Sequence, residues 1–211
     1  MDSTVRTALL GLCSIVGTAC VTGPPQHLKI KDDGIVMPSV RADYTFSRNR
    51  SEDGTKTGRG GLSFEATRAE GDTGPASNYS VRSMQLQGRY RFVDTPRVRG
   101  KLLFGLEYAD LDAQVGSFHR SNAVLGPAIG LDLEVPIAGP LAGYAHGSFS
   151  AMLRATTSVR GELGMRATLG RYTNVFVGYR VWNFEQDVAF APNSDLEIRT
   201  EGLVIGMGFQ F

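Results

Sequence analysis

Apolar and polar residues alternate along most of this chain. In its last eleven residues, EGLVIGMGFQF, large apolar side chains occupy every second position from Leu203 to Phe211. Such a period of two recurs in nine segments, at residues 38–47, 61–68, 83–92, 101–108, 124–135, 141–153, 159–169, 175–182 and 203–211. A period of two is typical of β-strands, and the 3.6-residue period of an amphipathic helix is missing. The pattern therefore predicts an all-β fold.

Alternation alone does not tell which face is buried, because a soluble β-sandwich would hide the apolar face. Three features favour a barrel in lipid. The segments reach about ten residues, enough for a tilted strand to cross the hydrocarbon. Tight turns at 93–97, 136–140 and 170–174 alternate with longer polar connections at 70–78, 110–119 and 187–195. Aromatic residues lie near segment ends, where interfacial girdles belong, at Tyr90, Phe92, Tyr108, Tyr172, Phe209 and Phe211.

The last strand carries the most specific local pattern. With Gly206, Phe209 and a terminal Phe211, it resembles the C-terminal signature of small bacterial outer-membrane β-barrels of the eight-stranded kind. Val204 stands where that family more often has a polar residue. The resemblance covers about residues 59–211. It implies that these three residues form an insertion signal for the barrel-assembly machinery, that the protein lies among the lipids of the bacterial outer membrane, and that Phe211 sits at the periplasmic rim.

The first residues differ from the rest. Residues 1–19 read as a signal peptide, because Arg6 precedes an apolar stretch, residues 8–19, that is too short to span a bilayer. The small residues before Cys20 resemble a bacterial lipoprotein signal, which implies a lipid on Cys20, although Gly17 stands where that family usually has an aliphatic residue. Ordinary secretion with cleavage after Ala19 is the alternative. Residues 20–34, with a proline pair and several charges, are predicted to be a tether.

The predicted number of strands depends on how the first alternating segment is assigned. Single-chain bacterial barrels have an even number of strands, with both chain ends periplasmic, yet nine segments alternate. We favour a closed antiparallel up-and-down transmembrane barrel of eight strands within residues 35–211. Residues 35–48 would then form an extra strand or pack on the wall. The alternative is ten strands, in which residues 26–31 complete the count.

The polar face of these strands would point into the lumen. It carries a dense set of both signs, namely Arg89, Arg91, Lys101, Glu107, Asp132, Glu134, Arg160, Glu162, Arg166 and Arg180. The interior of an eight-stranded barrel is just wide enough for side chains to fill it. We therefore expect these charges to pair and to close the lumen. A narrow channel for small solutes is the alternative, and ten strands would favour it.

Three residues have the side-chain types of a hydrolase active site. His146 and Ser148 share a strand face, and Glu162 lies on the neighbouring segment, so a base, a nucleophile and an acid of acyl-ester hydrolysis are present. In these three residues the chain is similar to the lipid A 3-O-deacylases, although Phe149 stands where that family has Asn. The alternation turns the pair toward the lumen, whereas a lipid-processing site should meet the bilayer. A deacylase-like hydrolase is therefore a second alternative, and we expect no catalysis.

Composition limits the remaining functions. A chain of 211 residues with a net charge of +1 indicates one domain and gives no reason to expect a nucleic-acid partner. Its three histidines, His27, His119 and His146, are scattered, so no metal site is predicted. Phosphate-binding and dinucleotide-binding motifs are missing, so no cofactor is expected. What remains is a structural barrel or one whose polar loops dock another envelope protein.

The terminal aromatic residue provides a first test. Deleting Phe211 is expected to reduce membrane insertion, because the resemblance makes this residue part of the insertion signal. The measurement is the fraction of heat-modifiable protein recovered in the membrane. Normal recovery of the truncated chain would contradict this role.

Overall fold

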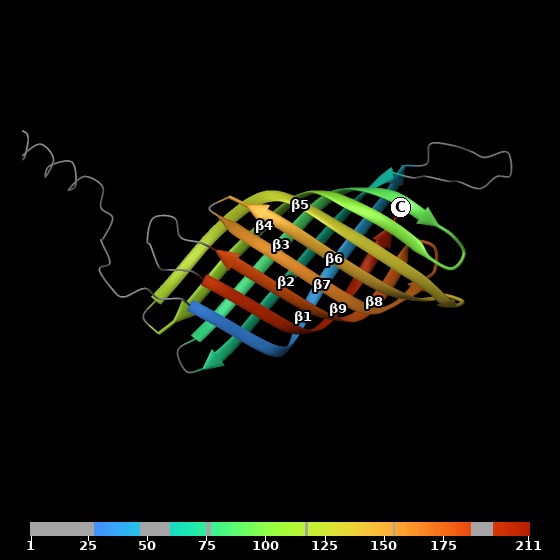
Figure 1. Ribbon diagram of the computed structural model, residues 1–211. Coiled ribbons are helices and arrows are strands. Elements are labelled where there is room, and N and C mark those ends of the chain that lie inside the picture. The colour runs from blue at the N-terminus through green and yellow to red at the C-terminus, as the bar shows by residue number, and fades with distance from the viewer. Residues whose placement is uncertain (1–27, 47–59, 75–76, 117, 154, 187–195) are drawn as a thin grey trace, which may run out of the picture.

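The computed structural model describes residues 28–46, 60–74, 77–116, 118–153, 155–186 and 196–211. These residues form nine strands that close into one barrel in sequence order (Figure 1). The strands are β1 (Leu28–Phe46), β2 (Gly60–Gly74), β3 (Ser77–Asp94), β4 (Arg99–Val115), β5 (Phe118–Ala138), β6 (Leu141–Met152), β7 (Thr156–Leu169), β8 (Thr173–Gln186) and β9 (Leu196–Gln210). The all-β closed barrel predicted from the alternation is confirmed.

The barrel closes between its first and last strands, which lie side by side in blue and red in Figure 1. This pair is parallel and runs from Leu28 beside Leu196 to Asp43 beside Gln210, whereas the other neighbours are antiparallel. The last residue also belongs to the wall. The Phe211 amide donates to the Asp43 carbonyl at 2.9 Å, and its own carbonyl accepts from the Thr45 amide at 3.0 Å.

The favoured count of eight strands and the alternative of ten are both wrong for the described residues, and so is the antiparallel pairing throughout. An odd number of strands makes the first and the last run in the same direction. The described chain therefore enters the barrel at one end and finishes at the other, so the expectation that the barrel begins and ends on one side is also wrong. We call the end at Phe211 the C-terminal end and the end at Leu28 the far end.

A glycine bulge interrupts the alternation of the first strand. Residues 28–34, predicted as tether, belong to β1, and residues 35–46 of the predicted extra segment continue the same strand. Gly34 has a φ of +87°, and the register with β9 shifts between Asp33 and Ile35. This bulge moves the alternation by one residue, so Lys31 and Asp33 point outward before it and Val36 points outward after it. Because of this change of phase, no single period of two runs through the whole of β1 in the sequence.

Two of the predicted longer connections are strand instead. β2 ends at Gly74 and β3 begins at Ser77, while β4 ends at Val115 and β5 begins at Phe118. Polar residues in 70–78 and 110–119 lie on the outer face of long strands, which is why their composition resembled that of loops. The third predicted connection, 187–195, lies outside the described residues.

Both faces of the wall change polarity along the barrel. On β4 the outward side chains from Leu102 to Tyr108 are apolar, but the next two outward positions are Asp110 and Asp112. The inward face changes in the opposite sense, because Lys101 and Glu107 are followed by small or apolar residues. Near the C-terminal end the barrel is thus apolar outside and charged inside, and near the far end it is polar outside and apolar inside.

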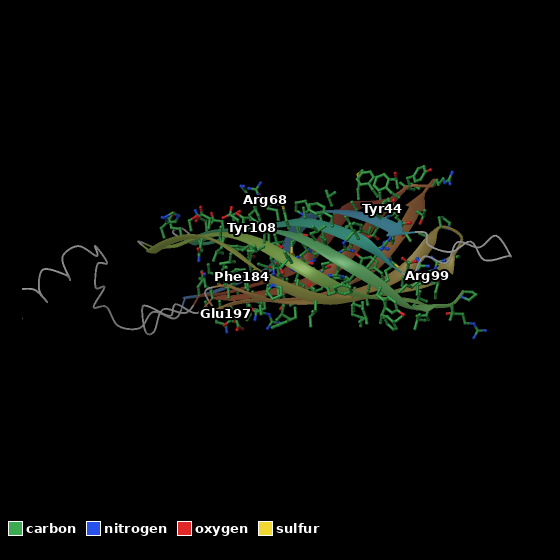
Figure 2. All side chains as sticks on the ribbon, turned by 90° about the horizontal axis from the view of Figure 1, so that it is seen from above. Tyr44, Arg68, Arg99, Tyr108, Phe184 and Glu197 are labelled. Carbon is green, nitrogen blue, oxygen red and sulfur yellow. The ribbon has the colours of Figure 1, made fainter. Side chains whose placement is uncertain are left out.

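The outward face changes from apolar to charged at the same level on neighbouring strands. Arg68, Arg82 and Asp110 are the first charged outward residues of β2, β3 and β4, and the strand register places them next to one another. Figure 2 shows Arg68 and Glu197 toward one end and Tyr44 and Arg99 toward the other. Exposed apolar residues on the C-terminal side of this level form the outer belt, which includes Val36, Val40, Tyr44, Leu62, Phe64, Met84, Leu86, Phe104, Leu106, Ile129, Leu131, Phe149, Leu163, Met165, Val175, Val177, Leu203 and Ile205.

The far half is filled like an ordinary protein core. Its interior holds Trp182, Phe184, Leu111, Leu196, Ile198 and Val81, each with at most 2% of its surface exposed. Tyr79 lies beside them and donates a hydrogen bond to Asp32 at 2.9 Å. Burial and this bond to a carboxylate raise the pKa of the Tyr79 phenol well above its usual value. The ladder between β1 and β2 runs only from Ser39 to Phe46 on β1. Tyr79 therefore links β3 to β1 on the far-end side of that ladder.

The bulge gives a matched pair of substitutions. Gly34→Ala is expected to lower the free energy of unfolding by about 1–2 kcal/mol, because an L side chain is strained at this positive φ. A Cβ at Gly161 also meets open space, but its φ is not in the left-handed region, so Gly161→Ala should be neutral or stabilising. Urea unfolding of the barrel in detergent micelles measures both. Equal midpoints for the two variants would show that the bulge imposes no backbone constraint.

Candidate functional site

The lumen next to the far-end core holds twelve charged side chains, which we call the charge network. Six are basic and six are acidic: Arg41, Arg89, Lys101, Arg160, Arg166 and Arg180, with Asp43, Glu65, Glu107, Asp132, Glu134 and Glu162. They come from seven of the nine strands, and the alternation of each strand brings them inward, because each lies on the face opposite the outer belt. Their equal numbers make the network neutral when His146 is neutral.

Two arginines and two glutamates form the centre of the network. Arg41 donates from Nε to Glu65 at 3.1 Å and from Nη2 to Glu162 at 2.8 Å. Arg180 is fully buried and binds the same two carboxylates, with Nε 2.8 Å from Glu162 and with an ion pair to Glu65. These residues come from β1, β2, β7 and β8, so the cluster joins four strands across the lumen.

A second cluster is centred on Glu107 of β4, which is fully buried. Its carboxylate accepts from Ser83 at 2.7 Å and from Gln85 at 2.9 Å, and it also binds Ser150 and Arg160. The Arg160 guanidinium lies 4.3 Å from the ring centre of Trp182. This cation–π contact joins the charge network to the apolar core of the far half.

A third group of pairs lies toward the C-terminal end. Arg89 binds Asp43 at 2.9 Å and Arg166 binds Glu134 at 2.9 Å. The ring of His146 places Nδ1 2.6 Å from Asp132. Together the three groups pair each acidic residue of the network with at least one basic residue or histidine. The barrel is thus filled by buried salt bridges.

The structure places nine of the ten predicted lumen residues in this network. They are Arg89, Lys101, Glu107, Asp132, Glu134, Arg160, Glu162, Arg166 and Arg180. Arg91 lies nearer the C-terminal rim, where 27% of its side chain is exposed and it pairs with Asp94. Sequence reasoning did not include Arg41, Asp43 or Glu65 in the network. All three lie on the polar faces of alternating segments, and Arg41 and Asp43 belong to the segment that the eight-strand prediction treats as an extra strand or wall-packing segment.

The three residues of the predicted insertion signal lie at the seam between β9 and its neighbours. Gly206 faces inward, and a Cβ there would lie 2.1 Å from the Ser39 carbonyl oxygen and 2.4 Å from the Phe176 ring. The Phe176 ring also lies 4.3 Å from the Arg41 guanidinium. Glycine at 206 therefore lets an aromatic ring pack between the wall and the network. Phe211 is 64% exposed, while Phe209 is half-buried.

The candidate hydrolase residues also face inward. His146 and Ser148 are 6% and 7% exposed, and Glu162 is the register partner of His146 on β7. The ring of His146 is bound to Asp132, and Glu162 is bound to Arg41, Arg180 and Tyr144. The Glu162 carboxylate is therefore bonded to two arginines and a tyrosine, while the His146 ring is bonded to Asp132. Cys20, the predicted lipidation site, lies outside the described residues.

This chain matches no family model, no curated protein and no solved structure. Within the described residues, no group of three or more His, Cys, Asp or Glu side chains has a metal-binding arrangement. The same residues include no helix that is long and apolar enough to cross a membrane.

The central cluster should dominate stability. Arg180→Leu is expected to lower the free energy of unfolding by about 3–5 kcal/mol, because it leaves Glu65 and Glu162 buried with one partner fewer. The control is Lys31→Ala, which removes an ion pair to Asp33 whose two side chains are 55% and 56% exposed. That change should stay within about 0.5 kcal/mol. A small effect at Arg180, measured by denaturant unfolding in micelles, would contradict the assigned network.

Proposed function

We propose that this chain is a transmembrane β-barrel of the bacterial outer membrane whose lumen is closed, and that it has a structural or partner-docking role. The single observation that carries the proposal is the outer belt on all nine strands, at the level where the lumen is charged. A soluble barrel would place these two surfaces the other way round, as the far half does. The lipid bilayer is the solvent that makes an apolar exterior stable.

The dimensions of the belt support this proposal. Its outward apolar run extends from Met84 to Phe92 on β3 and from Leu203 to Phe211 on β9. A strand tilted by about 45° needs about 9–11 residues to cross the hydrocarbon. The backbone is paired on both sides of β1 at this level, by β2 from Ser39 to Phe46 and by β9 up to Asp43. A closed ladder leaves few unpaired backbone groups in lipid.

Aromatic residues border the belt on both sides. Tyr44, Tyr90, Tyr172, Phe92 and Phe211 are exposed near the C-terminal end. At the opposite border lie Tyr108 and Tyr179, and the Tyr179 hydroxyl donates to Glu201 at 3.1 Å. An aromatic ring with a polar tip suits the interface between hydrocarbon and headgroups. The two sets therefore support a belt bounded by water on each side.

The closed lumen favours a structural role over the alternative of a narrow channel. Arg180, Glu162, Glu107 and Arg160 each have at most 3% of their surface exposed, and the apolar core fills the far half behind them. A solute path would require these pairs to separate. The inward His146 and Ser148 give no support to a lipid A hydrolase, and we propose no catalytic role for them.

The two chain ends give the proposal an orientation. If Phe211 is an insertion signal at the periplasmic rim, the far half stands on the outer side of the membrane. Its outward face carries paired charges such as Lys29 with Glu197 at 2.6 Å. This half has the surface of a soluble protein, and we propose it as the part that meets another envelope protein. A lipid on Cys20 would be attached eight residues before Leu28, the residue at which β1 begins.

Two outward positions on β9 test the membrane assignment. An environment-sensitive fluorophore attached at Ile205→Cys should show blue-shifted emission in lipid vesicles and quenching by a lipid-borne quencher, because this position lies in the outer belt. The matched control, Arg199→Cys, points outward from the same strand beyond the belt and should behave as in water. Cys13 and Cys20 are replaced by Ser in both. Equal aqueous behaviour at the two positions would contradict a transmembrane barrel.

A further inference from the structure

The connection between β3 and β4 carries an excess of positive charge at the C-terminal end of the barrel, where Figure 2 labels Arg99. We call residues 91–99 the hairpin tip. It contains the three arginines Arg91, Arg97 and Arg99, and its one acidic residue is Asp94. Three arginines against one carboxylate leave two positive charges in excess.

The turn of the hairpin tip holds Arg97 in an exposed position. The Thr95 amide donates to the Val98 carbonyl at 2.9 Å, and the Val98 amide donates to the Thr95 hydroxyl at 3.0 Å. Pro96 restricts the backbone between them. Arg97 itself is exposed and makes no hydrogen bond or ion pair within the part of the chain that the structure describes. Its guanidinium group therefore has free N–H donors.

Asp94 lies within the hairpin tip and Glu134 contacts it, and both carboxylates are bound by other arginines. Asp94 lies 2.6 Å from Arg91. Glu134 lies 3.0 Å from Arg99, whose side chain remains 48% exposed, and it is also paired within the charge network. The carboxylates that reach the tip thus leave Arg97 without a counter-charge.

An aromatic side chain joins the hairpin tip to the outer belt. Phe92 is 45% exposed and lies in a bulge, because the register with β4 shifts between Arg91 and Val93. A Cβ at Gly100 would lie 2.6 Å from the Phe92 ring, so glycine at this position leaves room for the ring. Tyr90 precedes it on the outer face and is 43% exposed. The excess of positive charge therefore begins where the apolar surface ends.

The opposite border of the belt on the same strands has charges of both signs. Arg68 and Arg82 lie there beside Asp110, and Arg68 is paired with Glu70. Two arginines next to two carboxylates leave no excess. Among the described residues of β2, β3 and β4, an anionic group is therefore attracted to the C-terminal border of the belt.

We propose that the hairpin tip binds the phosphate of an anionic phospholipid headgroup through Arg97 and Arg99, while the acyl chains lie along the outer belt beside Tyr90 and Phe92. A guanidinium group presents a planar fork of N–H donors that matches phosphate oxygens. A headgroup without a cation of its own supplies the negative charge that the tip lacks, and its chains cover the adjacent apolar surface. The inference rests on the proposed position in the membrane and adds the class of lipid that the barrel selects.

Local quenching by lipids in vesicles tests this site. The full chain, with Cys13 and Cys20 replaced by Ser, carries a fluorophore at Tyr90→Cys, next to the hairpin tip, or at Met84→Cys, toward the other end of the belt on the same strand. The vesicles contain phosphatidylcholine and phosphatidylglycerol at one fixed ratio, and bromine on the acyl chains of either lipid is the quencher. We expect phosphatidylglycerol to be enriched at position 90 by at least about fivefold, the effect of one basic residue at a membrane surface, and not at position 84.

Two matched variants locate the site. Arg97→Gln removes one charge from an exposed turn and should lower the enrichment at position 90 about fivefold. Arg82→Gln is the control, because Arg82 is also exposed and also makes no ion pair within the described residues, but it lies at the opposite border of the belt. This variant should leave the enrichment unchanged.

Each outcome has a distinct meaning. Enrichment that is lost in Arg97→Gln and kept in Arg82→Gln supports the site. Equal quenching by both lipids at position 90 overturns the site and leaves the barrel in the membrane. Enrichment that sodium phosphate removes, when sodium chloride at the same ionic strength does not, also overturns it, because the tip then takes free phosphate. Absence of quenching by either lipid at both positions contradicts the transmembrane barrel itself, and this inference with it.

Discussion

Every part of this barrel depends on the requirement that charges buried in its lumen be paired. Removing an ion from water costs several kcal/mol, and only well-placed partners and hydrogen bonds recover that cost. Arg180 has no exposed surface and meets Glu65 and Glu162, while Arg41 binds the same two carboxylates from another strand. A slip of one residue in any of these strands would turn its side chain to the outside. The pairs therefore specify the register as well as filling the lumen.

The second constraint is the match between the two faces of the wall. Where the inside is charged, the outside is the apolar belt, and where the inside is the core around Trp182 and Phe184, the outside carries residues such as Arg68 and Glu197. One strand thus serves two environments, because side chains alternate along it without a break. The change falls between Tyr108 and Asp110 on β4 and at the register neighbours of Asp110 on β2 and β3. The proposed position of the barrel, half in lipid and half in water, would account for both surfaces.

The parallel pairing of β1 and β9 allows a barrel with an odd number of strands to close. A parallel ladder is slightly less stable per residue than an antiparallel one, but here it runs nearly the whole length of both strands and continues to Phe211. Arg41 on β1 reaches Glu162 on β7 only because β1 closes the barrel beside β9. The bulge at Gly34 then keeps β1 in the correct phase on both sides of the polarity change.

The sequence by itself determined the all-β class, the two unlike faces of each strand and most of the charged residues of the lumen. These follow from a period of two, which is a local property of each segment. Only the tertiary structure decided the number of strands, the parallel closure and the pairing of Arg41 with Glu65 and Glu162. Parity suggested that the first alternating segment was surplus, and the bulge at Gly34 concealed its continuation to Leu28. Partners of a buried charge lie on strands far apart in sequence, so they depend on closure and register, which no local pattern contains.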